Sequence, residues 1–227
     1  MMKALVPTCN RPDLFARLIS RLDGFEVIGF VNNTNPENIL MYKNIDLPAN
    51  VKLIFTDILG EPKACHVHTF RKMLTYVNDE CLIIEDDVIP CVSFNDELLN
   101  RIRILKGKCQ EFTLSPINQP FRNSDFYSGG TSRPVQIGGF EFIDSAWVDG
   151  NFYMTAGVLQ AMKLWLSTPV KVYGVSSGIG RRNSAEIHKR SWKMFTAVPT
   201  MVEHLDHDSV MFGDHRKSVP LISRFGM

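Results

Sequence analysis

Three consecutive carboxylates, Glu85, Asp86 and Asp87, come directly after the apolar run CLII at residues 81–84. If a strand continues through them, Glu85 and Asp87 point to one side and Asp86 points to the other. Adjacent negative charges repel one another, and a nearby cation would relieve that repulsion. Mg²⁺ and Mn²⁺ prefer oxygen ligands, and either ion could also hold a diphosphate. The triplet therefore predicts a divalent-cation site, with a solvated acidic turn as the alternative.

The sequence before the triplet supplies the elements that must position it. Apolar runs predict strands at residues 3–8, 26–32, 51–56 and 81–85. Between them we expect a helix with Pro12 in its first turn and Asn10 as its cap, a short helix at 35–44, and a helix over 62–77. Strands that alternate with helices predict a mostly parallel sheet, and ligands bind beyond the carboxyl ends of its strands.

The second half of the chain is less regular. It predicts helices at 92–107, 156–166 and 185–194, strands at 110–115 and 152–155, and a long loop rich in Gly, Ser, Asn and Pro at 116–134. This change of pattern suggests a single domain over 1–227, with a nucleotide-binding half at about 1–95 and an acceptor half at about 96–227.

Composition narrows the class of protein. The chain has 227 residues, of which 44% are hydrophobic and 22% are charged, so it can bury a core of its own. A net charge of +1 excludes a strong overall field toward nucleic acid or anionic membrane. The five cysteines form no CxxC pair, which favours reduced thiols and a cytoplasmic location. No apolar stretch is long enough to serve as a membrane anchor, so we expect none.

Two stretches, LVPTCNRPDLFARLI at 5–19 and LIIEDDVIPCVSF at 82–94, together resemble the GT-A glycosyltransferases of the family-2 type. The resemblance returns at 147–209 and so spans most of the chain. It implies a GT-A (Rossmann-like) α/β fold with a mostly parallel central sheet flanked by helices. It also implies a nucleoside-diphosphate sugar as donor, most simply a UDP-sugar, and Mn²⁺ or Mg²⁺ as cofactor. Glu-Asp-Asp would stand here for the family's Asp-x-Asp motif.

The resemblance also implies roles for single residues. In the first turn, Pro7, Thr8 and Arg11 match positions that line the nucleoside site, and Asn32 matches a position that contacts the base or the ribose. Within the acidic motif, Asp87 corresponds to the direct metal ligand and Glu85 to the residue nearer the ribose, while Asp86 belongs with the donor-binding residues. His204, in the segment VPTMVEHLDHDS, matches the histidine that completes the metal site.

The helix expected at 62–77 adds a geometric argument. At 100° per residue, its apolar side chains fall on one side, and Lys63 and His66 fall on that side nearer its beginning. Lys63 could then contact the diphosphate, with a surface charge as the alternative, and His66 is either a donor-site residue or a core histidine. His68 falls on the opposite face and is expected to be solvated.

The loop before the strand at 152–155 resembles the glycine-containing loop that closes over the donor sugar, where Gly150 would permit close approach of the backbone. Inverting members carry an acidic base at the head of the last helix, but this chain has Asn183 and Ser184 there and keeps Glu186. The catalytic base is then Asp149, Asp144 or Glu186, with Asp149 first, or the enzyme retains configuration and needs none.

The acceptor stays open among a saccharide, a lipid-linked glycan, a protein and a hydroxylated base in DNA. Basic residues of the second half would suit a polyanion such as modified DNA: Arg122, Arg133, Arg181, Arg182, Lys189 and Arg190. Three other functions also fit part of the sequence. A nucleotidyltransferase would need a Gly-rich phosphate loop, which is missing after the first strand. A metal-dependent hydrolase would combine residues 66–68 with 204–207, although a helix turns His66 and His68 apart. A non-catalytic nucleotide-binding module is the third.

Overall fold

A twisted central sheet organises the computed structural model, which describes residues 1–32, 36–56, 62–117, 132–148, 150–169 and 178–205. Over these residues, nine strands form one sheet in the order β3-β2-β1-β4-β9-β6-β10-β8-β7. Their bounds are β1 Lys3–Thr8, β2 Glu26–Asn32, β3 Val51–Thr56, β4 Cys81–Ile83, β6 Phe112–Ser115, β7 Arg133–Ile137, β8 Phe140–Asp144, β9 Phe152–Met154 and β10 Lys193–Val198. A separate two-stranded sheet pairs β5 (Val88–Pro90) with β11 (Val202–His204).

Seven of the nine strands of the large sheet point in the same direction, and only β9 and β8 point the other way. β1 is parallel to both β2 and β4, β2 to β3, and β6 to β10. β9 runs antiparallel between β4 and β6, and β8 runs antiparallel to β10 and β7. The prediction of an α/β fold with a mostly parallel sheet is therefore confirmed.

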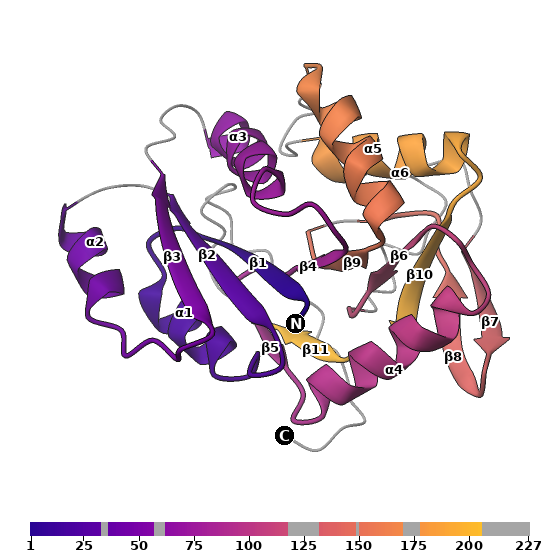
Figure 1. The fold of residues 1–227 in the computed structure, drawn as a ribbon, viewed down its shortest axis with the longest axis horizontal. Helices are drawn as coiled ribbons and strands as arrows, with labels where there is room; N and C mark the ends of the chain where they lie inside the picture. The colour runs from indigo at the N-terminus through magenta and orange to yellow at the C-terminus, as the bar shows by residue number, and fades with distance from the viewer. Residues whose placement is uncertain (33–35, 57–61, 118–131, 149, 170–177, 206–227) are drawn as a thin grey trace.

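Helices cover both faces of the sheet (Figure 1). Their bounds are α1 Pro12–Ile19, α2 Pro36–Lys43, α3 Pro62–Leu74, α4 Phe94–Lys106, α5 Ala156–Ser167 and α6 Ile179–Lys189. Alternate side chains of β1 enter different cores: Val6 packs with the apolar residues of α1 and α4, whereas Leu5 packs with those of α3, α5 and α6. Burial on both faces explains why β1 and β2 read as continuous apolar runs.

The first half of the chain follows the sequence closely. β1, β2 and β3 have the predicted bounds. The helix expected over 62–77 is α3, which ends at Leu74; the predicted stripe of Phe70, Met73 and Leu74 is buried, as is Val77 just beyond the helix. His68 is exposed, as expected. None of the described helices is long and apolar enough to cross a membrane.

Two predictions near the site are wrong. Arg11, and not Asn10, occupies the N-cap position of α1, because Asn10 adopts a left-handed conformation with φ 56°. β4 ends at Ile83 and the chain turns at Asp86 and Asp87, so the expected alternation of side chains through the triplet does not hold.

The second half departs more from the sequence-based expectations. The helix expected at 185–194 is α6, which begins and ends earlier, and strand β10 follows it at Lys193. The loop expected at 116–134 lies mostly outside the described residues, but its last two residues belong to β7, which forms a hairpin with β8. The short strands β5 and β11 were also missed.

Candidate functional site

The carboxyl ends of β1 and β4 bring the first turn of the chain to the acidic triplet. The two strands pair in parallel, with Leu5 opposite Ile83, so the residues that follow them meet at one edge of the sheet. There the hydroxyl of Thr8 donates to Asp86 Oδ2 at 2.6 Å and lies 2.5 Å from the hydroxyl of Tyr42. Asp86 is completely buried.

Arg11 joins the same cluster from the beginning of α1. Its guanidinium forms an ion pair with Asp86 and donates from Nη1 to Asp87 Oδ2 at 3.2 Å. Its backbone N–H donates to the hydroxyl of Tyr42 at 3.2 Å. Tyr42, on α2, thus holds both Thr8 and Arg11 against Asp86 and Asp87, which form the acidic turn. The short helix α2 therefore contributes a residue to the site.

Burial and charge oppose each other in this cluster. Burial raises the pKa of Asp86 to about 7, although the guanidinium of Arg11 acts to lower it. Burial acts to lower the pKa of Arg11, but Asp86 and Asp87 outweigh it and the pKa of the guanidinium is raised. Arg11 therefore remains a cation next to Asp86, whose ionised form it favours.

The small sheet brings a histidine to the turn from the far end of the described chain. β11 runs antiparallel to β5 with His204 opposite Val88, and the backbone N–H of Leu205 donates to Asp87 O at 2.7 Å. His204 Nε2 then lies 3.7 Å from Asp87 Oδ2. Asp87 Oδ1 and His204 Nδ1 are both buried and have no hydrogen-bond partner.

Asp87 and His204 fit part of a metal site. A carboxylate and an imidazole are both ligands that Mn²⁺ or Mg²⁺ accepts, and the buried oxygen of Asp87 has no hydrogen-bond partner. Within the part of the chain that the structure describes, no group of three or more His, Cys, Asp or Glu side chains is placed to hold a metal ion. A cation held at this turn would therefore need further ligands beyond these two side chains.

Glu85 is directed away from this cluster by Asn151. Its backbone N–H donates to Asn151 Oδ1 at 2.8 Å, and Asn151 Nδ2 donates back to Glu85 Oε2 at 3.1 Å. A Cβ atom on Gly150 would lie 2.3 Å from Glu85 Oε1, so the carboxylate packs where only glycine leaves room. The loop before β9 thus orients the first carboxylate of the triplet, while the other two face Arg11.

The remaining donor-site candidates are less closely connected. Pro7 is half-buried in β1, and Asn32, at the end of β2, accepts a hydrogen bond from Thr56 Oγ1 at 3.2 Å. The ring of His66 packs edge-on against Phe70, with ring centroids 6.3 Å apart. Lys63 belongs to α3, but its side chain lies outside the described residues, as does all of Asp149.

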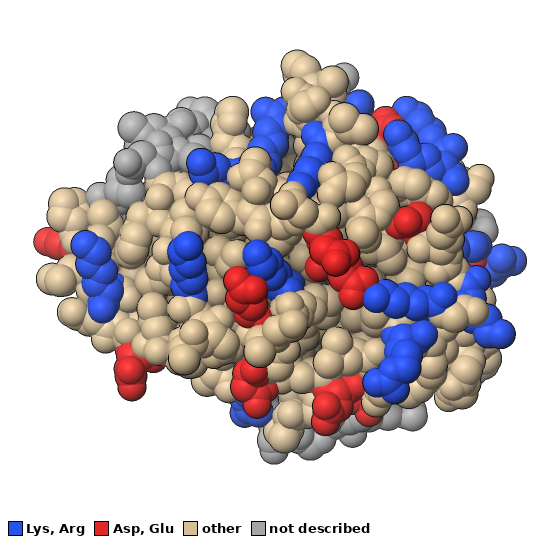
Figure 2. Space-filling model, viewed as in Figure 1, with Lys and Arg blue, Asp and Glu red and all other residues tan. Residues whose placement is uncertain are grey.

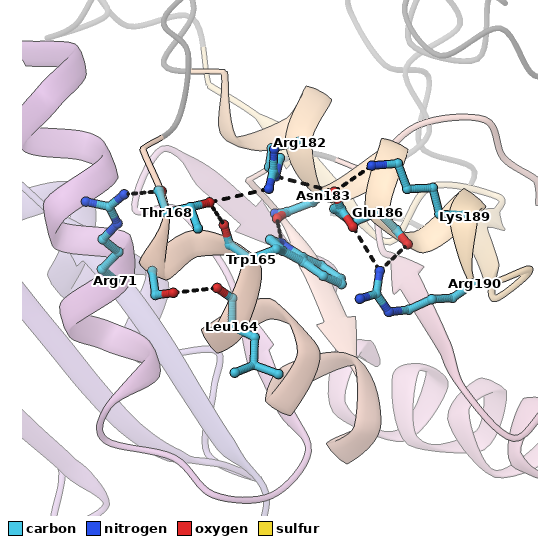
Figure 3. A network of polar contacts seen from close by, with 10 residues as sticks. Arg71, Leu164, Trp165, Thr168, Arg182, Asn183, Glu186, Lys189 and Arg190 are labelled. Carbon is cyan, nitrogen blue, oxygen red and sulfur yellow. Dashed lines mark hydrogen bonds and ion pairs between the residues drawn. The ribbon is translucent and has the colours of Figure 1, made fainter.

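Glu186 lies in a cluster of its own on α6, drawn in Figure 3. Its carboxylate accepts hydrogen bonds from Lys189 Nζ and Arg190 Nη1, each at 2.9 Å, and Arg182 Nε lies 3.6 Å away. The hydrogen bond from Lys189 is the main reason why the pKa of Glu186 is lowered. A carboxylate held by three cations is a weak proton acceptor.

The positions before Glu186 have structural partners. Asn183 Oδ1 accepts from the indole N–H of Trp165 at 2.8 Å, and Ser184 Oγ accepts from the backbone N–H of Val148 at 3.0 Å. The other described base candidate, Asp144, pairs with Lys193 at 2.9 Å. Asn183 Oδ1, Ser184 and Asp144 are therefore engaged within the fold, whereas Asn183 Nδ2 is buried without a hydrogen-bond partner.

Charge on the surface is mixed rather than uniform. Figure 2 shows acidic and basic side chains interspersed over the face viewed, with basic side chains gathered over α6 at the upper right. Arg182, Lys189 and Arg190 belong to this region and share Glu186. Arg122 lies outside the described residues.

Two residues of the site were missed by sequence reasoning. Asn151 follows Gly150 directly, and an amide next to a loop glycine was a signal that could have been used. Tyr42 carried no such signal, because its helix has little amphipathic pattern and its partners are far away in the sequence.

Comparison with known proteins shows the fold. No family model and no curated protein matches the sequence. Among solved structures, residues 1–349 of S. aureus TarS in complex with UDP-GlcNAc match with a TM-score of 0.56 at 13% identity, over 93% of this chain and 60% of that one. Glucosyl-3-phosphoglycerate synthase from Mycobacterium tuberculosis, in complex with Mn²⁺, UDP-glucose and phosphoglyceric acid, matches with a TM-score of 0.53 at 9% identity.

That second match covers 84% of this chain and 65% of the synthase. A further mycobacterial protein matches at 11% identity with a TM-score of 0.53, over 86% of this chain and 65% of its own length. The chain thus spans somewhat less than two thirds of these three solved chains. The likeness shows a GT-A fold, in agreement with the fold class predicted from the sequence.

Proposed function

We propose that this chain is a glycosyltransferase that moves a sugar from a nucleoside-diphosphate sugar, in the first instance a UDP-sugar, to a hydroxyl acceptor with the help of Mn²⁺ or Mg²⁺. One observation carries the proposal: Asp87 and His204, more than a hundred residues apart in the sequence, meet at the carboxyl ends of β1 and β4 with buried atoms that have no hydrogen-bond partner. Similar folds crystallised with UDP-GlcNAc, and with UDP-glucose and Mn²⁺, support this donor class.

In this proposal Asp87 and His204 hold the cation, which would neutralise charge on the leaving diphosphate. Pro7, Thr8 and Asn32 line the nucleoside site, and Glu85, held by Asn151 against Gly150, faces the ribose. Lys63 and His66 contribute from the beginning of α3. Asp86 is the buried anchor that Thr8 and Arg11 share, so it keeps the first turn and the acidic turn together.

Three carboxylates are candidates for the catalytic base: Asp149, Asp144 and Glu186. Asp149 is the first candidate because it precedes Gly150, where an added Cβ atom would collide with Glu85. Glu186 is disfavoured as a base because Lys189, Arg190 and Arg182 hold its carboxylate. If no base is present, the enzyme retains configuration. The acceptor is a saccharide or a hydroxymethylated base in DNA, and the basic side chains on α6 support the second.

A panel of nucleotide sugars with Mn²⁺, scored for release of the nucleoside diphosphate, tests the proposal. We expect slow hydrolysis of one donor in the absence of acceptor, abolished by EDTA. Hydrolysis of none of the donors, together with one bound equivalent of zinc and no nucleotide binding, would instead identify a hydrolase. Release of pyrophosphate from a nucleoside triphosphate and a sugar phosphate would identify a nucleotidyltransferase.

A further inference from the structure

Arg11 sits between two of the three carboxylates that the proposed function assigns to the donor site. Its guanidinium pairs with Asp86 and donates to Asp87 Oδ2 at 3.2 Å, and its side chain is only 20% exposed. The backbone fixes its origin, because its N–H donates to Tyr42 and its carbonyl accepts from Phe15 N–H at 3.0 Å. The guanidinium of Arg11 is thus a positive charge held in contact with the acidic turn.

The same oxygen of Asp87 faces both Arg11 and the histidine. Asp87 Oδ2 lies 3.2 Å from Arg11 Nη1 and 3.7 Å from His204 Nε2. A divalent cation held by Asp87 and His204 would lie within a few ångströms of the guanidinium. Repulsion between a divalent ion and a guanidinium at such a distance lowers affinity by an order of magnitude or more in a partly buried site.

We propose that Arg11 makes cation binding at the acidic turn depend on the nucleotide. While the guanidinium stays on Asp87, the turn binds Mn²⁺ or Mg²⁺ weakly. When a diphosphate arrives with the cation, the guanidinium transfers to the phosphate oxygens, which it can bind with two parallel hydrogen bonds. This inference rests on the proposed function and adds an order of binding to it: the cation and the donor bind together.

Other contacts hold the turn in place when the guanidinium leaves Asp87. Asp86 keeps the hydrogen bond from Thr8, whose hydroxyl is itself placed by Tyr42. Asp87 keeps the backbone contact from Leu205 on its carbonyl, so the turn stays in place. Only the guanidinium has to change partners, and its long side chain makes that a change of rotamer.

Calorimetric titration of R11Q with Mn²⁺ alone tests the inference. We expect R11Q to bind Mn²⁺ at least about tenfold more tightly than the wild type, because the competing positive charge is gone. R17Q, which removes the same charge from an exposed position on the same helix, should stay within about twofold of the wild type. In saturating UDP, R11Q and the wild type should bind Mn²⁺ with similar affinity. Binding of Mn²⁺ by R11Q that is no tighter than in the wild type would overturn the inference.

A second measurement uses the wild type alone and decides the matter even if R11Q does not fold. The guanidinium NMR signals of Arg11 should stay unchanged when Mg²⁺ is added alone and should shift when Mg²⁺ is added with UDP. A shift with Mg²⁺ alone, or none with Mg²⁺ and UDP together, contradicts the inference. Failure of the wild type to bind UDP at any Mn²⁺ concentration would instead overturn the proposed function, which is a separate result.

Discussion

In the acidic turn the carboxylates outnumber the cations, whereas in the cluster around Glu186 the cations outnumber the carboxylates. At the turn, the two carboxylates of Asp86 and Asp87 share one guanidinium; on α6, one carboxylate is shared by Arg182, Lys189 and Arg190. The side chains of the cations on α6 are between 37% and 67% exposed around a buried Glu186, whereas Asp86 is fully buried. The α6 cluster satisfies its carboxylate, while the turn leaves buried atoms of Asp87 and His204 without hydrogen-bond partners.

The difference in charge, burial and unpaired atoms indicates which cluster can bind a ligand. The ion pairs of α6, whose cations reach solvent, cost little to form and stabilise the folded protein slightly, so no ligand is needed to explain why they form. Buried acidic groups in excess of their cations are costly to fold, and such a cost points to a function. The acidic turn is therefore the candidate site, and substitutions in the two clusters should affect different properties of the protein.

The largest effect is expected from D87N. Removing the charge of the proposed metal ligand should lower Mn²⁺-dependent hydrolysis of the donor by about a hundredfold or more. D13N, an exposed substitution in the first turn of α1, is the matched control and should keep the wild-type rate. Rates of nucleoside diphosphate release check this, and wild-type hydrolysis by D87N would remove Asp87 from the mechanism.

G150A should have the next largest effect. Its Cβ would lie 2.3 Å from Glu85 Oε1, so the carboxylate must leave Asn151 and its orientation toward the donor is lost. We expect roughly tenfold weaker donor binding and a loss of about 1–3 kcal/mol in the free energy of unfolding. G107A is a fair control, since a Cβ there meets its nearest neighbour at 3.4 Å. Equal donor affinities for G150A and G107A would show that the position of Glu85 is unimportant.

Y42F should have a smaller effect, confined to stability and to the first turn. It removes the hydroxyl that contacts Thr8 and Arg11, which should cost about 1–2 kcal/mol in the free energy of unfolding. Urea denaturation measures this, with Y76F as the comparison because the Tyr76 ring packs edge-on against Phe30. If Y42F were no less stable than Y76F, the role of Tyr42 in positioning the turn would be wrong.

E186Q should have the smallest effect, and a pH-dependent one. Because the pKa of Glu186 is lowered in the folded protein, mainly by Lys189, its ion pairs stabilise the fold above its unfolded pKa of about 4.5 and that contribution is lost as the pH falls through the folded value. We expect E186Q to be about 1 kcal/mol less stable at pH 7, and the difference to shrink below pH 4.5.

The control for E186Q is E26Q, whose half-exposed carboxylate lies 3.8 Å from Lys3 and should contribute almost nothing. Urea midpoints at pH 7 and pH 3 make the comparison. A loss of sugar transfer by E186Q with unchanged stability would instead identify Glu186 as the catalytic base.

The sequence predicted the first strands well because each contains an apolar run, which in β1 and β2 is buried on both faces. It also contained a signal for the hairpin of β7 and β8, since Gly138 and Gly139 sit between the strands with φ 58° and 85°, the conformation that a two-residue hairpin turn needs. β5 and β11 could not be predicted, because three-residue strands carry no pattern and their pairing joins distant segments.

The candidate site shows the same limits. The resemblance placed Asp87 and His204 in one site, and the structure brings them to within 3.7 Å of each other. The directions of the three carboxylates could not be predicted, because they depend on where β4 ends and on Asn151. The network of Thr8, Tyr42 and Arg11 depends on packing between α1 and α2, for which the sequence has no local sign.

The central claim is that the acidic turn and His204 bind a diphosphate through a cation. Calorimetric titration of the wild type with UDP tests it most directly, first in the presence of Mn²⁺ and then of EDTA. We predict binding with Mn²⁺ that becomes at least about tenfold weaker in EDTA. An affinity for UDP that EDTA leaves unchanged would contradict the account.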